Sequence, residues 1–241
     1  MNNWKLDPAH DLGLPLKERA RSLRREDGLL ETLLHATWWS FVRGYLAVYH
    51  RLEIVGRENI PAEPPFVLVA NHSSHLDALA LAAALPARLR LRVFPIAAGD
   101  TFFETPAAAA FAAFVLNALP MWRRSCGPHA LRELRERLIN ERCAYILFPE
   151  GTRTRDGCMN AFKPGIGMLV AGTQVPVVPG FLDGCFLAWP PQARLPRPRK
   201  VGLRIGQPVW CSHLADERSG WERATAELEA KVRALGGPSR D

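Results

Sequence analysis

Cysteine is scarce in this sequence, and its spacing shows no paired pattern. The 241 residues include five cysteines, and no C-x-x-C pair occurs. An odd number at wide spacings argues against a disulfide framework and against a zinc site, and it favours a reducing compartment. Nothing in the sequence requires a metal, and we expect none. The five are Cys126, Cys143, Cys158, Cys185 and Cys211.

Acidic side chains are fewer than basic ones in this sequence. Lysine and arginine total 31 against 24 for aspartate and glutamate, which gives a net charge of +7. A basic protein favours anionic partners, such as nucleic acid, an anionic membrane surface or a phosphorylated substrate. The basic residues are dispersed and no nucleic-acid recognition motif occurs, so we expect no nucleic-acid partner.

Apolar runs of membrane-spanning length are missing as well. The first residues lack the basic-then-apolar pattern of a signal peptide. Residues 28–52 are rich in Leu, Trp, Tyr and Phe, but Arg43 interrupts a stretch that would need about 20 apolar residues to span a membrane. The uncharged stretch at 105–122 is divided by Pro106, Asn117 and Pro120.

Residues 1–51 instead favour contact with a membrane surface. Residues 15–27 predict a short basic amphipathic helix, and residues 28–52 predict a longer aromatic one. Tryptophan and tyrosine on a helix preceded by arginines are typical of an element in the membrane interface, so we expect peripheral or monotopic attachment to the cytoplasmic face of the cell membrane. The alternative is a helix packed in the core. The polar residues that gather on one side of the longer helix are Glu31, His35, Arg43 and His50.

The remainder, residues 52–241, alternates strand-like and helix-like segments. Arginine alternates with apolar residues at 88–95, which predicts a half-exposed strand, and Ser219 to Glu222 has the pattern of a capping box. This order predicts a single α/β domain, in which helices cover both faces of a mostly parallel or mixed central sheet. The predicted strands are 52–55, 67–70, 88–95, 118–122, 144–148, 174–180 and 199–209, and the predicted helices are 75–85, 106–116, 128–142, 163–169 and 219–235.

A polar cluster, Asn71 to Asp77, follows the strand predicted at 67–70. His72 and Asp77 can lie side by side where a strand gives way to a helical turn, which suits a base oriented by a carboxylate. The alternative is that both only start the helix, because Asn, Ser and Asp are common there for capping alone. His75 is a further possible base, but its spacing from Asp77 puts the two side chains on divergent sides of a helix.

A second polar stretch, Glu150 to Arg153, follows the strand predicted at 144–148. Gly151 permits close backbone approach, Arg153 offers a fork suited to phosphate, and Glu150 can orient hydroxyls or hold Arg153 in place. The alternative is an internal ion pair that stabilises a turn. Because sites in α/β sheets form beyond the strand ends, we expect both polar stretches to share one crevice.

No nucleophile motif accompanies these residues. The sequence has neither a G-x-S-x-G elbow nor a Walker A loop. A histidine with an aspartate but no partnered serine suggests that the substrate brings the nucleophile. A substrate hydroxyl, deprotonated by His72, would attack an activated carbonyl while Asp77 stabilises the imidazolium.

Four blocks resemble those of the glycerolipid acyltransferases, the 1-acyl-glycerol-3-phosphate acyltransferase family. Asn71–Asp77 resembles the N-H-x4-D block, and Phe148–Thr154 is similar to the third block almost letter for letter. Leu119–Arg123 and Val175–Pro179 resemble the second and fourth blocks. All four occur in the family order, within residues 52–210.

The resemblance implies an O-acyltransferase of phospholipid biosynthesis. Such an enzyme moves a fatty acyl group from acyl-CoA or acyl carrier protein to the hydroxyl of a lysophospholipid, here 1-acyl-glycerol-3-phosphate, to give phosphatidic acid. It uses no cofactor, and an N-terminal helix pair seats it on the bilayer. The resemblance makes His72 the base and Asp77 its orienting partner. It assigns acceptor binding to Arg123, Glu150, Gly151, Thr152 and Arg153.

One departure from the family pattern concerns the acceptor. Trp122 stands where an acid is usual, and Arg123-Arg124 follow it. Relatives with altered second blocks acylate other acceptors, such as glycolipids, ornithine lipids or other lysolipids, and this remains an alternative. A third possibility is an inactive scaffold that only binds membranes, which the intact His72 and Asp77 argue against.

Overall fold

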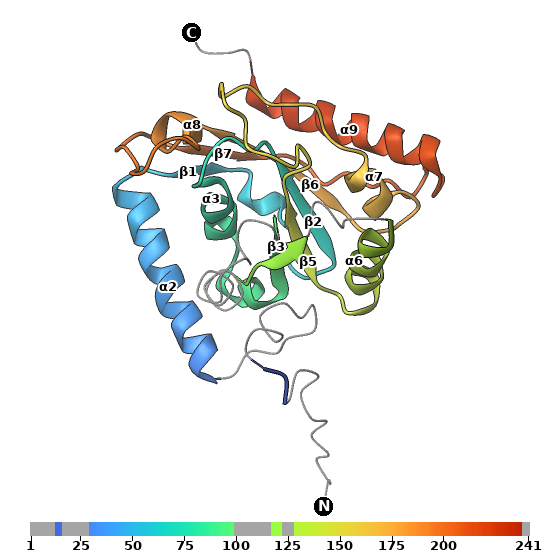
Figure 1. Cartoon of the computed structure of the whole chain (residues 1–241), viewed down its shortest axis with the longest axis horizontal. Helices are drawn as coiled ribbons and strands as arrows, with labels where there is room; N and C mark the ends of the chain where they lie inside the picture. Colours follow the sequence, from blue (N-terminus) through green and yellow to red (C-terminus); the bar gives the residue numbers. More distant parts are fainter. Residues whose placement is uncertain (1–12, 16–28, 99–116, 122–127, 238–241) are drawn as a thin grey trace, which may run out of the picture.

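Seven strands form one central sheet within the part of the chain that the structure describes. The computed structural model describes residues 13–15, 29–98, 117–121 and 128–237. The strand order is β1-β7-β6-β2-β5-β3-β4, and all neighbours are parallel except β6 and β7 (Figure 1). The strands are β1 (Glu53–Val55), β2 (Phe66–Ala70), β3 (Val93–Ala98), β4 (Leu119–Met121), β5 (Ala144–Leu147), β6 (Val177–Asp183) and β7 (Gly202–Ile205).

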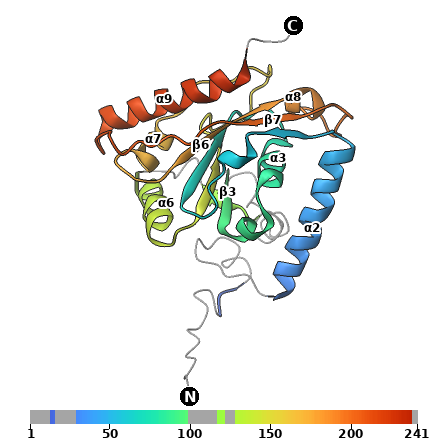
Figure 2. The ribbon, with the colours of Figure 1, turned by 180° about the vertical axis from the view of Figure 1, so that it is seen from behind.

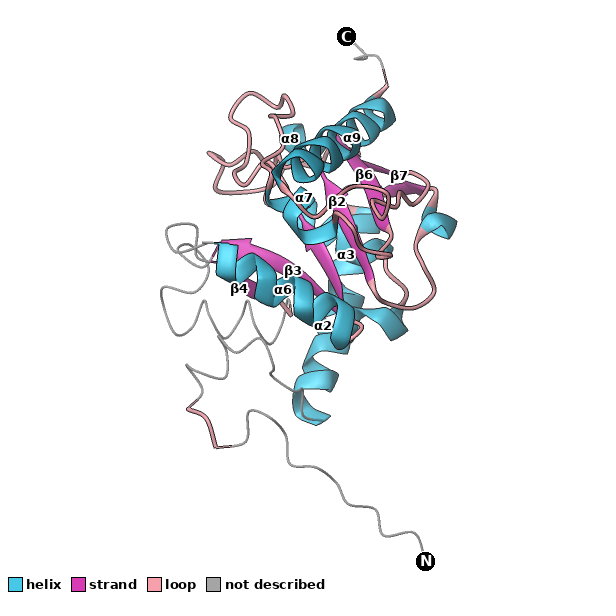
Figure 3. Cartoon of the chain, turned by 90° about the vertical axis from the view of Figure 1, so that its right-hand side faces the viewer, coloured by secondary structure: helices cyan, strands magenta, loops and turns pink. Residues whose placement is uncertain are grey.

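Helices cover both faces of this sheet. One face lies against α2 and α3, and the other against α6, α7 and α9, as the two opposite views and the side view show (Figures 1, 2 and 3). The helices are α2 (Leu29–Val48), α3 (Asp77–Ala84), α6 (Pro128–Asn140), α7 (Gly165–Val170), α8 (Cys185–Ala188) and α9 (Arg218–Gly236), with 3₁₀ turns η1 (Arg57–Asn59) and η2 (Ala87–Arg92).

Strand β2 separates two hydrophobic cores. It is buried along its whole length, as a strand with helices on both faces must be. Phe66 and Leu68 belong to the core beneath α2 and α3, whereas Val67 and Val69 belong to the core beneath α6, α7 and α9. This alternation follows from the period of two in a strand. The α/β domain with a mixed sheet, expected from the sequence, is therefore confirmed.

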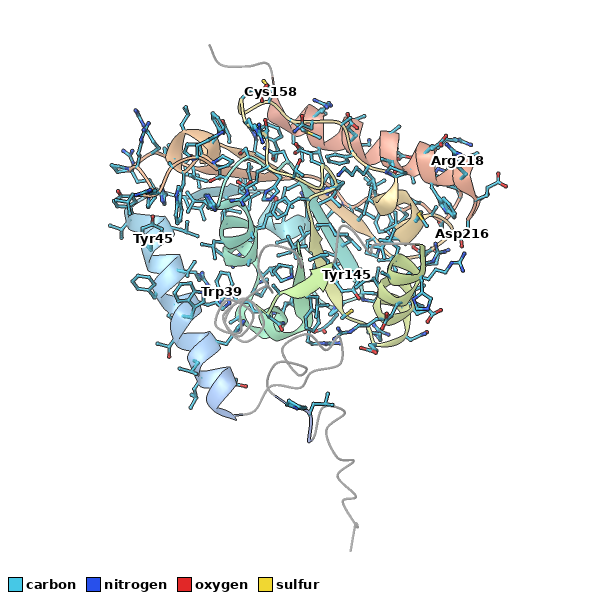
Figure 4. The ribbon with its side chains drawn as sticks, viewed as in Figure 1. Trp39, Tyr45, Tyr145, Cys158, Asp216 and Arg218 are labelled. Atoms are coloured by element: carbon cyan, nitrogen blue, oxygen red, sulfur yellow. The ribbon has the colours of Figure 1, made fainter. Side chains whose placement is uncertain are left out.

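Helix α2 faces the domain with the side that carries His35, whereas Arg43, which the sequence placed on the same polar side, is exposed. Trp39, Val42 and Leu46 are buried, and Figure 4 labels Trp39 on this helix. His35 is also buried, and its Nε2 accepts a hydrogen bond from Trp39 Nε1 at 3.0 Å. Burial, helped by the charge of Arg90, lowers the pKa of His35 to about 4, so the ring is a neutral acceptor.

The structure tests only part of the predicted N-terminal helix pair. The basic helix predicted at 15–27 lies outside the described residues apart from residue 15, and so does the helix predicted at 106–116. His50 does not belong to α2, which ends at Val48. Among the described helices, none is both long enough and apolar enough to cross a membrane.

The half-exposed strand predicted at 88–95 is wrong for residues 88–92 and confirmed as a strand only for residues 93–95. Residues up to Arg92 form the 3₁₀ turn η2, and β3 begins only at Val93. Leu89 and Arg90 are both buried, so the outward arginine face that the alternation suggested does not form. Arg90 Nη2 donates to the carbonyl of Leu85 at 3.2 Å, and the guanidinium lies over the ring of Trp39. These inward contacts favour a turn over a strand.

The capping box predicted at Ser219–Glu222 is also wrong. The N-cap of α9 is Glu217, whose carbonyl accepts the first helical bond from Trp221 N at 2.9 Å. Ser219 Oγ donates to the Glu217 carboxylate at 2.7 Å rather than capping a backbone N–H. The helix ends at Gly236, and Gly237 follows with a left-handed φ of 70°, as a glycine stop signal predicts.

Candidate active site

The two polar stretches meet at one edge of the sheet. Strands β2 and β5 are parallel neighbours, so the loops that follow them leave from the same side. His72 N donates to Glu150 Oε1 at 2.7 Å, and Thr154 N donates to the carbonyl of His72 at 2.9 Å. The backbone of His72 is therefore held on both sides by the second stretch.

His72 and Asp77 form a direct pair. His72 Nδ1 lies 2.9 Å from Asp77 Oδ2, and the carboxylate is fully buried. Because a carboxylate only accepts, Nδ1 carries the proton in this bond, which leaves the lone pair on Nε2. The His72 side chain is 21% exposed, so a substrate can reach it. The ring stacks on Phe148 with 4.1 Å between centroids, a contact that the sequence did not predict.

The capping role considered for Asp77 is not the one that the structure shows. Asp77 is the first residue of α3, and the helix N-cap, Leu76, has no side-chain capping bond. Asp77 Oδ2 instead accepts the backbone N–H groups of Ser73 at 2.6 Å and Ser74 at 2.8 Å, which precede the helix. The same oxygen therefore orders the loop and orients His72.

Glu150 secures the His72 loop through backbone contacts. One carboxylate oxygen accepts from His72 N, and the other accepts from Asn160 N at 2.9 Å. Burial raises the pKa of Glu150, although these hydrogen bonds oppose the rise. The sequence interpretation gave Glu150 to substrate hydroxyls or to Arg153, whereas these contacts make it a support for the histidine.

The remaining residues of the second stretch are Gly151, Thr152 and Arg153. Gly151 has a left-handed φ of 75°, and a Cβ there would lie 2.7 Å from the ammonium nitrogen of Lys163. Glycine adopts this φ without strain, and Lys163 beside it is a cation that sequence reasoning did not place at the site. Arg153 is half-buried and contacts the ring of His75, while Thr152 is exposed. Arg123 lies outside the described residues.

Cys185 is the thiol that adjoins the pair. It is buried at the start of α8. Burial raises the pKa of the Cys185 thiol well above its ordinary value, and the charge of Asp77 raises it further. The thiol therefore stays protonated and offers no thiolate nucleophile. In the described ranges, no group of three or more His, Cys, Asp or Glu side chains is placed to hold a metal ion.

Comparisons with known proteins agree on one family. A model of the acyltransferase family matches residues 51–182. The human 1-acyl-sn-glycerol-3-phosphate acyltransferase alpha is 32% identical over 131 residues, which cover 54% of this chain and 44% of that protein. The mouse alpha protein is 30% identical over 181 residues, covering 74% of this chain and 58% of its own. The chain thus spans about half the length of these curated relatives.

A solved structure extends the similarity to nearly the whole chain. The crystal structure of the 1-acyl-sn-glycerophosphate acyltransferase PlsC from Thermotoga maritima has a TM-score of 0.69 and 26% sequence identity with this chain. The match covers 94% of this chain and 88% of that one. The family model takes in β1 to β5 and almost all of β6, and with them both polar stretches. The chain belongs to the acyltransferase family.

Proposed function

We propose that the protein is an O-acyltransferase that esterifies a lysophospholipid, with 1-acyl-glycerol-3-phosphate as acceptor and phosphatidic acid as product. The observation that carries the proposal is the His72–Asp77 pair, which leaves the Nε2 lone pair for a substrate, while Arg153 contacts His75 of the same loop. The names of the curated relatives, 1-acyl-sn-glycerol-3-phosphate acyltransferases, support the same acceptor. The acyl donor would be acyl-CoA or acyl carrier protein, with no cofactor.

The reaction needs only a base and a nucleophile from the substrate. His72 Nε2 removes the proton of the acceptor hydroxyl as its oxygen attacks the thioester carbonyl carbon. The tetrahedral intermediate collapses, the C–S bond breaks, and the departing thiolate takes the proton back from His72. Asp77 stabilises the imidazolium between these two steps, and the products are an ester and a free thiol.

The acceptor phosphate would be bound by the second stretch. Arg153 supplies the guanidinium, and the exposed ammonium of Lys163 lies beside Gly151 on the same loop. Thr152 and Arg123 complete the acceptor site in this proposal. The altered second block, with Trp122 in place of an acid, supports a second candidate in which the acceptor is a glycolipid, an ornithine lipid or another lysolipid.

An acceptor panel tests the proposal. Purified protein would be supplied with radiolabelled acyl-CoA or acyl carrier protein and, separately, with lysophosphatidate, other lysophospholipids, a glycolipid and a lyso-ornithine lipid. We expect the highest kcat/KM with lysophosphatidate. Turnover confined to an acceptor without phosphate would replace the first candidate by the second. No turnover with any acceptor would support the inactive membrane-binding scaffold.

Replacing Arg153 with lysine should weaken the binding of the acceptor far more than the binding of the donor. Lysine keeps the charge but loses the planar fork, so we expect the acceptor KM to rise about tenfold or more while the donor KM stays within about twofold. Initial rates with each substrate varied in turn measure both constants. The matched control is Arg155→Lys at an exposed position of the same loop. Equal effects on both substrates would contradict a phosphate role.

Helix α2 supplies the proposed membrane contact of residues 1–51, and residues 52–241 the proposed catalytic domain. Opposite its buried side, α2 exposes Leu33 at 58%, Phe41 at 64% and Val48 at 82%. A helix that packs on a domain with one side and exposes large apolar groups on the other is suited to lie in a membrane interface. We propose peripheral or monotopic attachment to an anionic, cytoplasmic membrane face on this basis.

Removing two of these side chains should release the protein from liposomes. Each large apolar group contributes about 1.5–3 kcal/mol when it is fully buried, so we expect Leu33→Ser with Phe41→Ser to lower the partition coefficient at least tenfold. Sedimentation with vesicles that contain anionic lipid measures it. Ile139→Ser, at an exposed apolar position on α6, should leave partition unchanged. Equal loss in both variants would argue against α2 as the contact.

A further inference from the structure

His75 links Arg153 to the segment that follows α8. The Arg153 guanidinium nitrogen Nη1 contacts His75 Nδ1. The same guanidinium nitrogen lies 3.1 Å from His75 Nε2. His75 Nε2 also lies 3.4 Å from the carbonyl oxygen of Pro191, and the ring packs against Trp189 with 5.0 Å between centroids. His75 N also donates to the Trp189 carbonyl at 3.4 Å. The ring therefore has a defined position between two segments.

These contacts favour a neutral ring. A guanidinium only donates, and Arg153 contacts both ring nitrogens, so it needs a lone pair on one of them. Only the neutral imidazole has such a lone pair, and its one N–H remains as a donor. A protonated ring would have no lone pair for Arg153 and would repel it.

The surroundings of His75 favour this neutral form. Burial lowers the pKa of His75, and the charge of Arg153 lowers it further, against the Pro191 carbonyl and the charge of Asp77. The ionisable groups that act on the ring are Arg153, Asp77 and His72. At neutral pH the ring therefore accepts from Arg153, and acidification removes the acceptor.

We propose that His75 is a positioning residue for the acceptor, whose neutral ring holds the Arg153 guanidinium in the orientation that meets the acceptor phosphate. This inference rests on the proposed function, because it assigns phosphate binding to Arg153. It gives His75 a role in acceptor affinity, distinct from the proton transfer at His72. It also makes acceptor binding weaken in acid, because the protonated ring has no lone pair for Arg153.

Two substitutions separate the hydrogen bond from the packing. His75→Phe keeps an aromatic ring against Trp189 but has no acceptor for Arg153. His75→Asn is smaller but offers an oxygen near the position of Nδ1. We expect His75→Phe to raise the acceptor KM about tenfold, with kcat and the donor KM within about twofold, because a hydrogen bond to a charged group is lost. His75→Asn should stay within about threefold of the unaltered protein.

The pH dependence of acceptor binding distinguishes the proposed role of His75 from a packing role, because packing contacts alone would not change it. Binding of 1-oleoyl-glycerol 3-phosphate to full-length His72→Ala protein would be measured at pH 5.5 and 7.5 without an acyl donor, so that no turnover occurs. The same measurement on the His72→Ala, His75→Asn protein is the control, because both proteins meet the same ionisation of the ligand phosphate. We expect the Kd to rise more on acidification when His75 is present.

The outcomes distinguish this inference from the proposed function. If Arg153→Lys raises the acceptor KM and His75→Phe does not, the inference is wrong while the proposed function stands. An equal rise in the Phe and Asn variants, or equal pH dependence in the two binding proteins, would also overturn it. If lysophosphatidate is not a substrate of the unaltered protein, the proposed function itself fails.

Discussion

Replacing His72 with alanine should reduce turnover by about 10²–10⁴-fold, the usual contribution of a positioned general base. The donor and acceptor KM should change little, because the base acts on the hydroxyl proton in the transition state rather than on either substrate in the ground state. Steady-state rates with radiolabelled donor measure both quantities. The fold should persist, since the His72 contacts with Glu150 and Thr154 use its backbone atoms, which alanine retains.

An exposed histidine provides the matched control for this experiment. His213 lies on the surface, so His213→Ala should leave kcat and both KM values unchanged. Thermal unfolding of both variants should coincide with that of the unaltered protein within a few degrees. If folded His72→Ala kept near-normal transferase activity, the assignment of the catalytic pair would be wrong. His75, the alternative base considered from the sequence, would then be the next residue to replace.

Replacing Asp77 with asparagine should cost turnover by about 10²–10⁴-fold as well. Asp77 Oδ2 accepts hydrogen bonds from His72 Nδ1, Ser73 N and Ser74 N. An amide oxygen can take that place, but it has no charge to stabilise the imidazolium. If the amide nitrogen takes the place instead, it presents a donor to three donors. Either arrangement weakens the base, and the second also disturbs the loop.

Non-additivity identifies the pair as one unit. The double variant His72→Ala, Asp77→Asn should be no slower than His72→Ala alone, because Asp77 acts through the histidine. Asp183→Asn, at an exposed carboxylate, is the control and should leave turnover unchanged. A double variant that loses activity by the product of the two single losses would show that Asp77 acts independently of His72.

Much of the fold could be predicted from the spacing of apolar residues along the sequence. The buried strand at 67–70, the amphipathic helix at 128–142 and the short strand at 118–122 are confirmed within a few residues, because each has a strong local pattern of apolar side chains. The failures occur where a local pattern competed with tertiary contacts. Alternating arginines predicted a strand at 88–95, but Arg90 turns inward to the Leu85 carbonyl and Trp39.

The candidate site, like the fold, could be predicted only in part. Residue types and spacing were enough to select His72, Asp77, Glu150 and Arg153, because their chemistry is visible in the sequence. Their mutual roles were not visible. Glu150 was expected to bind hydroxyls or Arg153, but its carboxylate accepts hydrogen bonds from the backbone of His72 and Asn160. Nothing local to Glu150 indicates that a backbone N–H 78 residues away would reach it.

The sequence by itself determined the family, the α/β class and the residues capable of the chemistry, since each depends on neighbours within a few positions. Only the tertiary structure decided how these residues act together. Placing β2 beside β5 joins the His72 loop to Glu150 and Thr154. Folding the segment after α8 over the site gives His75 its contacts with Trp189 and Pro191. Such contacts depend on strand order and loop packing, which local hydrophobic patterns do not specify.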